Sequence, residues 1–391
     1  MNRNFVLFFT IKEFENVHLY KDVGLVPCYL CKEYNLNGKI IYSNEVKKEL
    51  PKQFRNLELE EIKFIKFPNI IRKLDKFKLL ENISFYKYLL KNAKKIDYLM
   101  FFHYSVDKIF LIQLYKFLNP KGKIYIKLDS SGNYKEKGLK TMVSKFLLKK
   151  YEKKVDLFSI ETIDAMEKLK IKNLFGIQNF EKLIYIPNGF DENYLIENKI
   201  IVKTYEEKEN IIITVGRIGA PEKNNELLLK ALEKIDLQEW KVLLIGPYTE
   251  NFKELYDDFI KKNQNKRDKV LLVGNIKSKD KLYEYYNKAK SFILTSNRES
   301  FGIVLVEALR FGDYIIATDV GATRDITENG KIGSIIEIDN LMQLQSRLEE
   351  VIAKKINLEK KYKDSLNLSN KSFLWSKIIK NKFLKKIFDE D

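Results

Sequence analysis

Short apolar runs alternate with longer, lysine-rich segments along most of this 391-residue chain. Runs that are apolar on both faces and separated by helix-length stretches are typical of parallel sheets covered by helices. They form two series, divided by a polar and acidic stretch near residues 190–208. The pattern therefore predicts an α/β fold with two Rossmann-like, doubly wound parallel-sheet domains. The expected strands are residues 4–9, 39–43, 62–67, 97–102, 123–128, 155–160 and 182–188 in the first series, and 210–216, 240–246, 269–275, 290–296, 313–319 and 333–338 in the second.

The acidic stretch sets the expected domain boundary. We assign residues 1–195 to an N-terminal domain and residues 196–370 to a C-terminal domain, since a chain of 391 residues exceeds one compact core. Residues 371–391 begin with a basic amphipathic helix that carries Trp375. This helix is expected to pack on the body of the protein, and a membrane surface is the alternative.

The formal charge of +17 is concentrated in the first half of the chain. Residues 51–150 hold 23 Lys and Arg against 9 Asp and Glu, whereas residues 201–391 hold 34 against 30. A basic surface of this kind suits an anionic membrane leaflet or a phosphorylated acceptor, although lysine enrichment can also reflect no partner at all. Segments 70–95 and 137–154 place lysines beside apolar stripes, as either a membrane surface or a helix that covers a sheet would.

Several classes of protein fit the sequence poorly. No apolar run approaches the ~18–20 residues of a membrane span, and the apolar start at residues 4–9 is too short for a signal peptide. We therefore expect a cytoplasmic protein, peripheral at most on the inner face of the cell membrane. Nucleic-acid-binding proteins usually carry aromatic platforms or a recognition helix, so no nucleic-acid partner is expected. Cys28 and Cys31 form a C-x-x-C that cannot complete a four-ligand zinc site, and core packing is favoured over a redox or metal pair.

Candidate chemistry lies where the strands of the second series end, because open α/β sheets bind ligands beyond the carboxyl ends of their strands. The run at residues 210–216 is followed by Arg217 and Lys223, just before a helix. Two cations at this place would neutralise a diphosphate. The alternative is a pair of ordinary surface charges.

Residues 297–312, NRESFGIVLVEALRFG, follow another of these strands. A helix is expected to begin near Phe301 and Gly302 and to end before Gly312, which would adopt the left-handed conformation. The N–H groups of its first turn, and the lack of a side chain at Gly302, predict an anion site. Ser300 is a helix cap, a part of this site, or both.

Glu307 falls in the second turn of this helix, which is otherwise too apolar for the surface. Burial of a carboxylate without partners costs several kcal/mol, so Glu307 needs hydrogen-bond donors. The two hydroxyls of a ribose would supply them, and a salt bridge to a core-facing cation is the alternative. Glu299, in the loop before the helix, would face whatever lies beyond the phosphates.

The segment ESFGIVLVE resembles the E-x7-E motif of the retaining glycosyltransferases of the GT-B fold, in the large family four of nucleotide-sugar-dependent enzymes. Further segments resemble the same family and occur in the expected order. These segments are IPNGFD (186–191), VGRIGAPEKNNELLLKAL (215–232), VGNI (273–276) and IIATDVGATRDI (315–326). The resemblance covers residues 182–340, and it is far thinner in the first domain.

The resemblance implies a role for each matching position. Arg217 and Lys223 would hold the donor diphosphate together with nearby helix amides, Glu307 would bind the ribose hydroxyls, and Glu299 would bind hydroxyls of the transferred sugar. The backbone near Asn275 would meet the base. The C-terminal helix would cross back onto the first domain, anchored by Trp375. The implied donor-binding set is Gly216, Arg217, Lys223, Asn275, Ile276, Glu299, Ser300, Phe301, Gly302, Ile303 and Glu307.

The first domain departs from the family pattern. Relatives commonly carry a glycine-rich loop after the first strand, and this chain offers only HLYKDVG there. Many relatives also place a histidine beyond a later strand, close to the transferred sugar. Asp129 occupies that place here and His103 ends the preceding strand, so either one could lie beside the reacting carbon. The acceptor-side candidates are His18, Lys21, Asp22 and Gly24.

We therefore expect an enzyme of the hexosyltransferase type. It would move a sugar from a nucleotide-diphosphate sugar to a glycan or lipid-linked acceptor, with retention of configuration, in bacterial surface polysaccharide or glycoconjugate synthesis. No metal or other cofactor is expected, because Arg217, Lys223 and the helix amides could stabilise the leaving diphosphate, and no D-x-D follows a strand. An epimerase-like protein of the same fold and, from the charge alone, a nucleic-acid-binding protein are the alternatives. The sugar, the base and the acceptor are left open.

Overall fold

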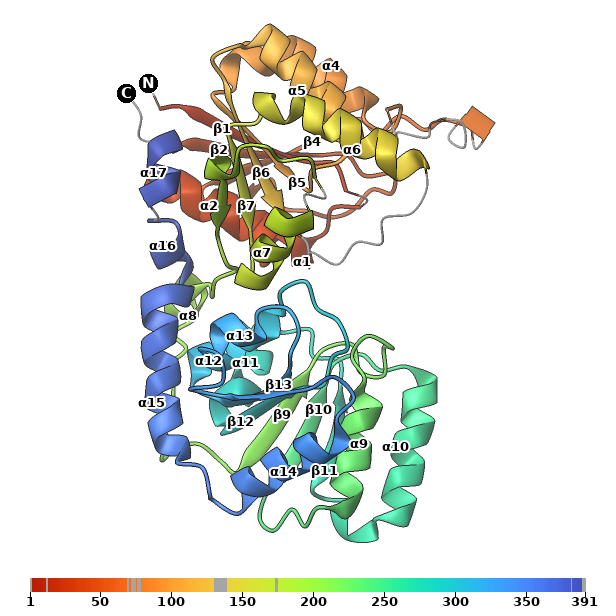
Figure 1. Ribbon diagram of the computed structural model, residues 1–391, viewed down its shortest axis with the longest axis vertical. Helices are drawn as coiled ribbons and strands as arrows, with labels where there is room; N and C mark the ends of the chain where they lie inside the picture. Colours follow the sequence, from red (N-terminus) through yellow and green to blue (C-terminus); the bar gives the residue numbers. More distant parts are fainter. Residues whose placement is uncertain are drawn as a thin grey trace. The chain divides into compact units, whose positions relative to one another are not determined.

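The computed structural model describes residues 2–11, 13–68, 70–71, 75, 79–129, 139–172, 175–380 and 382–388. The chain forms two compact units (Figure 1): Met1–Pro187 together with Trp375–Asp391, here the N-terminal unit, and Asn188–Leu374, here the C-terminal unit. The first division falls eight residues before the expected boundary at 195/196. Its position follows from packing, because Phe190 and Leu195 lie in the apolar core of the C-terminal unit.

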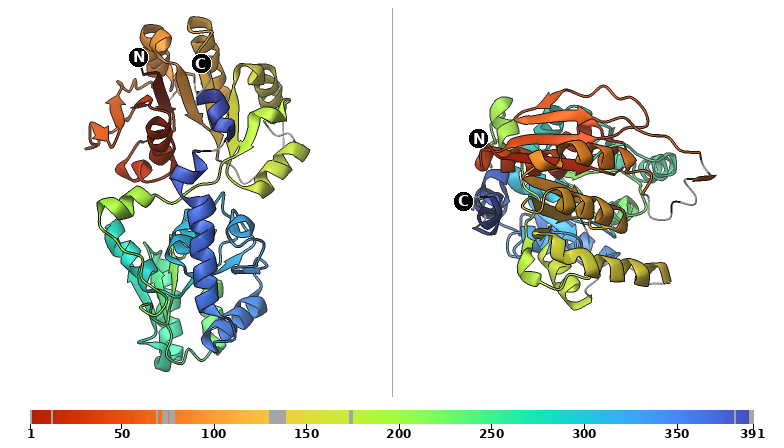
Figure 2. Two further views of the ribbon diagram at one scale, coloured as in Figure 1. Left: turned by 90° about the vertical axis from the view of Figure 1, so that its left-hand side faces the viewer. Right: turned by 90° about the horizontal axis from the view of Figure 1, so that it is seen from above.

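An eight-stranded sheet forms the centre of the N-terminal unit, in the order β3-β4-β2-β1-β5-β6-β7-β8. Its strand pairs are parallel, except that β3 runs antiparallel to β4. One face is covered by helix α2 (Asp22–Glu33) and the opposite face by α4 (Ile83–Asn92), α5 (Val106–Leu118) and α6 (Leu139–Tyr151) (Figures 1 and 2). The strands are β1 (Asn4–Phe9), β2 (Asn37–Tyr42), β3 (Gln53–Phe54), β4 (Leu57–Glu61), β5 (Tyr98–Phe102), β6 (Lys123–Leu128), β7 (Leu157–Ile160) and β8 (Leu183–Tyr185).

The third strand of this sheet was expected at residues 62–67, and that prediction is wrong. The strand is β4, which ends at Glu61, and residues 62–67 continue from it without regular structure. Leu57 and Leu59 are buried, whereas Glu58 is exposed and Glu60 is half-buried. This alternation is typical of a strand near a sheet edge with one polar face, and a search for runs that are apolar on both faces overlooks it.

A six-stranded, all-parallel sheet forms the centre of the C-terminal unit, in the order β11-β10-β9-β12-β13-β14. Helices α9 (Asn225–Lys234), α10 (Glu250–Lys262) and α14 (Leu341–Ile352) cover one face, and α11 (Lys279–Lys288) and α12 (Ile303–Phe311) cover the other. All six runs of the second series are strands, and the prediction of two parallel-sheet α/β units is confirmed. The strands are β9 (Ile211–Val215), β10 (Lys241–Ile245), β11 (Val270–Gly274), β12 (Ser291–Leu294), β13 (Tyr314–Thr318) and β14 (Ser334–Ile336).

The C-terminal tail is divided into short segments and is not one helix. A π-helical turn (Ser369–Phe373) precedes α16 (Trp375–Ile378) and α17 (Lys382–Phe388). Both helices belong to the N-terminal unit, where Trp375 is buried, with its ring centroid 6.5 Å from that of Tyr29. In the part of the chain that the structure describes, no helix has the length and apolar character needed to span a membrane.

Cys28 and Cys31 lie in α2, where both are buried and neither forms a disulfide. Their side chains belong to the apolar core between α2 and the sheet. The prediction that this C-x-x-C packs in the core is therefore confirmed.

Candidate active site

The predicted donor residues of the C-terminal unit lie at the carboxyl ends of its parallel strands, as the chain order requires. The ends of β9 and β10 approach each other closely at Gly216 and Gly246. A Cβ atom on Gly246 would lie 1.8 Å from the carbonyl oxygen of Gly216, and the φ of Gly246 is +138°. Only glycine fits such an approach. Gly246 therefore lets the ends of β9 and β10 pack against each other at this edge of the sheet.

Lys223 and Glu299 form an ion pair at this edge. The Lys223 Nζ lies 2.6 Å from Glu299 Oε1, and the Ser296 hydroxyl donates to the same carboxylate oxygen at 2.7 Å. The Lys223 and Glu299 side chains are 17% and 12% exposed. The Thr295 hydroxyl donates to the Lys223 carbonyl at 3.0 Å, which fixes the lysine backbone against the end of β12. The structure thus brings together two predicted residues that are 76 positions apart.

Arg217 does not join this pair. Its guanidinium contacts Glu222 in the same loop, and its side chain is 71% exposed. An exposed pair of this kind contributes little to stability, so Arg217 can leave Glu222 at small cost.

The helix that carries Glu307 begins as its sequence predicted. Gly302 precedes α12 with a φ of +90°, and Gly312 follows it with a φ of +75°. Gly302 is the N-cap residue, so the interpretation of Ser300 as a helix cap is wrong, and its role at the anion site stays a prediction. The loop after β13 fixes the loop before α12, because Ala322 N–H donates to the Phe301 carbonyl at 2.8 Å. The first turn of α12 therefore lies at the sheet edge with its N–H groups at the site.

Glu307 is held by a tyrosine that the sequence did not single out. The Tyr286 hydroxyl, on α11, donates to Glu307 Oε2 at 2.9 Å. Tyr286 is fully buried and stacks between Phe292 and Phe311, and burial, with the Glu307 carboxylate, raises its pKa well above the ordinary value. Glu307 itself is half-buried. One part of the carboxylate therefore has a structural partner, while the side chain keeps contact with solvent.

The predicted base-binding segment follows β11. Gly274 adopts a φ of +84°, and its carbonyl oxygen accepts a hydrogen bond from the Gly246 N–H at 2.9 Å. Asn275 is exposed, and Ile276 is half-buried against the apolar core beneath α11 and α12. The contact of this backbone with a base stays a prediction.

In the N-terminal unit, the buried Lys127 lies close to two of the residues predicted from the sequence, Asp22 and Asp129. Lys127, on β6, is fully buried, and its Nζ lies 3.0 Å from Glu161 Oε2 and 3.2 Å from Asp22 Oδ2. Burial raises the pKa of Glu161 to about 8, although Lys127 opposes this shift and Asp129 adds to it. The two carboxylates and Asp129 together hold the pKa of Lys127 above its ordinary value against the effect of burial.

His103 and Asp129 both lie in this charged group, so the structure does not separate the two candidates. His103 has a left-handed backbone with a φ of +60°, and its N–H donates to the Lys127 carbonyl at 2.8 Å. Burial lowers the pKa of the imidazole, and Asp129 is the strongest of the groups that oppose this shift. A non-glycine residue in this conformation is uncommon and stores local strain. The backbone thus holds the imidazole in a fixed place beside Asp129.

The four acceptor-side candidates have different environments. His18 accepts the Glu15 N–H on its Nδ1 at 2.9 Å and stacks on Phe14, as a structural histidine does. Lys21 is exposed. Gly24 allows close packing, because a Cβ atom there would lie 2.3 Å from the Leu19 carbonyl oxygen. Only Asp22 joins the charged group around Lys127.

Several residues that build these sites were missed from the sequence. Each belongs to an ordinary apolar run or helix, and its partner is distant in the chain, so no local pattern marks it. A second buried pair, Lys208 and Asp313, has the same character, with 2.7 Å between Nζ and Oδ1. Across the described residues, no three His, Cys, Asp or Glu side chains are grouped as metal ligands. The missed residues with a place in the two sites are Lys127, Glu161, Tyr286 and Ser296.

Comparison with known proteins identifies a family domain in the C-terminal unit. Residues 196–366 match the family model described as Glycosyl transferases group 1. An uncharacterized glycosyltransferase of Methanocaldococcus jannaschii is 27% identical over 257 residues, which make up 61% of this chain and 70% of that protein. The capsular polysaccharide biosynthesis glycosyltransferase CapM of Staphylococcus aureus is 26% identical over 219 residues, which cover 53% of this chain and 56% of CapM.

A solved structure extends the likeness to both units. HepE of Anabaena, in complex with UDP and glucose, matches 99% of this chain and 100% of its own length with a TM-score of 0.66. The identity is 12%, so this match concerns the fold alone. The family match identifies residues 196–366, within the C-terminal unit, as a group 1 glycosyltransferase domain. The likeness in architecture shows that the chain has the GT-B fold.

Proposed function

We propose that the protein transfers a sugar from a nucleotide-diphosphate sugar to a glycan or lipid-linked acceptor, in the synthesis of surface polysaccharide or glycoconjugate. The observation that supports this most directly is the group formed by Lys223, Ser296 and Glu299 at the carboxyl end of the sheet. A cation for the diphosphate and a carboxylate for sugar hydroxyls lie side by side there. HepE has the same fold and was solved with UDP and glucose bound, which supports a nucleotide sugar as the donor. CapM acts in capsular polysaccharide biosynthesis, which supports a polysaccharide as the product.

In this proposal, the bond from the anomeric carbon to the diphosphate oxygen breaks while the bond to the acceptor oxygen forms on the same face. Negative charge then grows on the leaving diphosphate, and the acceptor proton passes to its oxygen. Lys223 and the first-turn N–H groups of α12 stabilise that charge, because they are fixed before the reaction begins. Retention of configuration follows from attack on the face of departure. No divalent metal is needed, so we expect equal rates with Mg²⁺ and with a chelator.

The donor has to compete with the ion pairs that already occupy the site. Lys223 is paired with Glu299, and Arg217 is paired with Glu222. When the diphosphate replaces these carboxylates as the partner of the two cations, Glu299 becomes available to the hydroxyls of the transferred sugar. We infer that binding of the diphosphate and recognition of the sugar are coupled through this exchange.

Glu307 is proposed as the ligand of the ribose hydroxyls. The test begins with a thermal-shift screen of nucleotide sugars, followed by calorimetric titration of the donor that stabilises the protein most. Glu307→Gln should weaken the binding of this donor at least tenfold, since a carboxylate that accepts two hydroxyls is replaced by a neutral amide. Glu254→Gln, an exposed glutamate on α10, is the matched control and should bind as the wild type. Wild-type affinity in the Glu307 variant would remove the ribose role.

A single measurement distinguishes an epimerase-like activity from glycosyl transfer. An epimerase converts the donor without an acceptor, whereas a transferase requires one. Incubation of the screened donor with the protein alone, followed by NMR of the sugar, distinguishes the two activities. An epimerised product in the absence of acceptor would overturn the proposed transfer.

Membrane association of the N-terminal unit is a second proposal. Helices α4, α5 and α6 lie side by side on one face of the sheet (Figure 1), and each exposes a large apolar side chain. These are Leu90 at 64%, Phe117 at 79% and Phe146 at 66% exposed. Apolar side chains among lysines suit an anionic membrane surface. In a flotation experiment, the wild-type protein should be recovered with anionic vesicles. The double variant Phe117→Ser with Phe146→Ser should not be recovered. Equal recovery of the variant and the wild type would overturn this proposal.

A further inference from the structure

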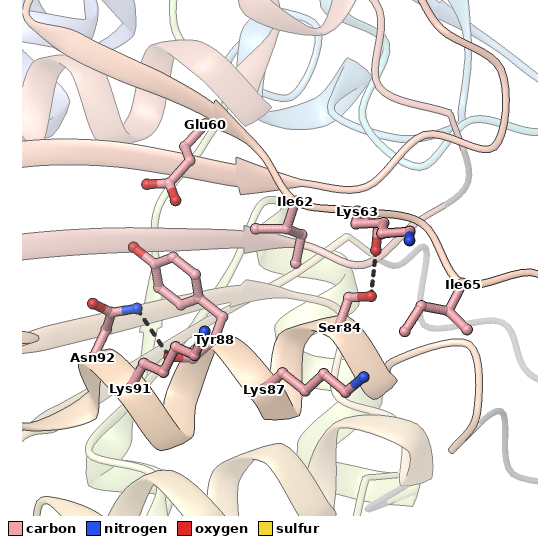
Figure 3. A pocket seen from close by; sticks show the side chains of 9 residues that line it. All are labelled: Glu60, Ile62, Lys63, Ile65, Ser84, Lys87, Tyr88, Lys91 and Asn92. Atoms are coloured by element: carbon pink, nitrogen blue, oxygen red, sulfur yellow. Dashed lines mark hydrogen bonds between the residues drawn. The ribbon is translucent and has the colours of Figure 1, made fainter.

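A pocket of about 320 Å³ lies in the N-terminal unit, away from the residues considered so far (Figure 3). It is bounded by the end of β4, by the chain that continues from it, and by helix α4. This is the region where a strand was wrongly expected at residues 62–67. The residues that line it are Glu60, Ile62, Lys63, Ile65, Ser84, Lys87, Tyr88, Lys91 and Asn92.

The pocket exists because the face of β4 toward α4 is polar. Helix α4 packs on the middle of the sheet through Phe85, whose ring centroid lies 5.1 Å from that of Phe8 on β1. At β4 the corresponding positions are Glu58 and Glu60, which form ion pairs with Lys39 on β2. The paired side chains of Glu58, Glu60 and Lys39 do not pack against α4 as apolar side chains would. The helix and the strand therefore stay apart at this end.

The lining carries surplus positive charge. Lys63, Lys87 and Lys91 have no carboxylate partner within ion-pair distance among the residues that the structure describes. The one carboxylate of the lining, Glu60, is already held by Lys39, with 2.8 Å between Nζ and Oε2. The three ammonium groups are thus available to an anion, and the pair between Glu60 and Lys39 does not neutralise them.

Two hydroxyl side chains and an apolar wall complete the lining. Lys63 and Lys87 extend at the end marked by Ser84 and Ile65, whereas Lys91 lies beside Tyr88 at the other end (Figure 3). Burial, with Glu60, raises the pKa of Tyr88 to about 12, so its hydroxyl keeps its proton at neutral pH. The Ser84 hydroxyl already donates to the Lys63 carbonyl, and the Tyr88 hydroxyl is hydrogen-bonded to Glu60. The lining therefore offers ammonium donors at both ends and isoleucine side chains along one wall.

We propose that this pocket is a binding site for a phosphate monoester. Lys63 and Lys87, at one end of the pocket and without carboxylate partners, match its two negative charges. The volume accommodates a phosphate with an attached group of the size of a sugar, which would extend toward Lys91. The isoleucine wall would contact the apolar face of that group. The same chemistry occurs in a phosphorylated sugar and in the headgroup of a phosphatidic acid, and both sources are tested below. This site lies beyond the proposed transfer reaction and does not depend on it.

The test compares two double variants with the same change in charge. Lys63→Gln with Lys87→Gln alters the end of the pocket that would hold the phosphate, and Lys94→Gln with Lys95→Gln alters two exposed lysines just after α4. Glucose 6-phosphate is the probe, glucose is its uncharged counterpart, and binding is measured by calorimetry at about 150 mM salt, where long-range charge effects are screened. We expect glucose 6-phosphate to bind the wild type at least tenfold more tightly than glucose. The pocket variant should lose at least tenfold in affinity, and the control variant less than twofold.

Flotation with vesicles of phosphatidic acid or of phosphatidylcholine distinguishes the two sources. A lipid headgroup is identified if the wild type floats with phosphatidic acid, glucose 6-phosphate prevents this flotation, and the pocket variant does not float. A soluble ligand is identified if the sugar phosphate binds but the wild type does not float. Equal losses in both double variants, or no preference for glucose 6-phosphate over glucose, would overturn the proposal. Phosphate bound at the donor site would be unaffected by the pocket variant, so this result is independent of the proposed transfer.

Discussion

The two units have the same kind of sheet, but they treat charge at the carboxyl ends of their strands differently. In the C-terminal unit, the pair between Lys223 and Glu299 keeps 17% and 12% of its side-chain surfaces exposed. In the N-terminal unit, Lys127 and Glu161 are 0% and 1% exposed. The first pair can exchange one partner for a ligand, whereas the second is closed to solvent.

This difference separates residues that bind from residues that support. An ion pair that a ligand can reach can exchange one member for another charged group, so a diphosphate can replace Glu299 as the partner of Lys223. A buried pair is strongly destabilised when one member is removed, because the other is left as an uncompensated charge. Lys127 joins Asp22, the first residue of α2, to Glu161 directly after β7, and its carbonyl holds His103. The buried group therefore fixes the place of His103 and Asp129.

The comparison is tested most strongly by Lys127→Met. This change keeps the length of the side chain, and it leaves Asp22 without its cation and Glu161 without its hydrogen-bond donor. The N-terminal unit should therefore lose about 3–5 kcal/mol of unfolding free energy. Trp375 is the only tryptophan left in a Trp240→Phe background, and its fluorescence in urea then reports on this unit. Lys121→Met, at an exposed position, should change the free energy by less than about 0.5 kcal/mol. Equal effects of the two variants would show that the buried group is not a support.

Lys223→Ala should have its largest effect on turnover and little on stability. Loss of one preorganised charge should lower kcat about 100-fold. The thermal unfolding temperature should fall less than in Lys127→Met, because Glu299 keeps the Ser296 hydroxyl as a donor and keeps contact with solvent. Lys230→Ala, an exposed lysine on α9, is the control for loss of charge. Unchanged turnover in the Lys223 variant would show that this lysine is only a surface charge.

The pH dependence of stability sharpens the comparison further. The pKa of Glu161 is raised from 4.5 to about 8 by burial, so the folded chain binds more protons than the unfolded chain between these values. Its contribution to stability is fully present below pH 4.5 and is lost as the pH rises through 8. Glu161→Gln should therefore flatten the fall in unfolding free energy between pH 5 and pH 8 by about 3 kcal/mol. Urea unfolding at several pH values measures this slope, and Glu167→Gln, which is exposed, should leave it unchanged.

The smallest expected effect is that of Tyr286→Phe. It removes the hydroxyl that donates to Glu307 and keeps the aromatic packing, so the carboxylate becomes less well oriented. A change of about 1 kcal/mol is usual for one such hydrogen bond, which corresponds to roughly fivefold weaker donor binding. The neighbouring Tyr285→Phe should bind the donor normally. Identical affinities in both variants would mean that Tyr286 does not position Glu307 for the ligand.

Local patterns in the sequence predicted the architecture well where strands are buried on both faces. The six strands of the C-terminal unit were all recognised, because each is a continuous apolar run. The prediction failed at β4, whose two buried leucines alternate with glutamates. The pocket next to β4 could not be foreseen either, because it results from the polar face of that strand beneath a helix.

The sequence by itself determined the two parallel-sheet units, the start and end of α12, and the motif residues at its edge, since periodicity, glycine conformation and motif spacing are local properties. Only the tertiary structure decided that Lys223 meets Glu299, that Tyr286 holds Glu307, and that Lys127 gathers Asp22 and Glu161. These partners are distant in the chain. Their pairing depends on which strands are neighbours and on how deeply each charge is buried, and no short stretch of sequence carries that information.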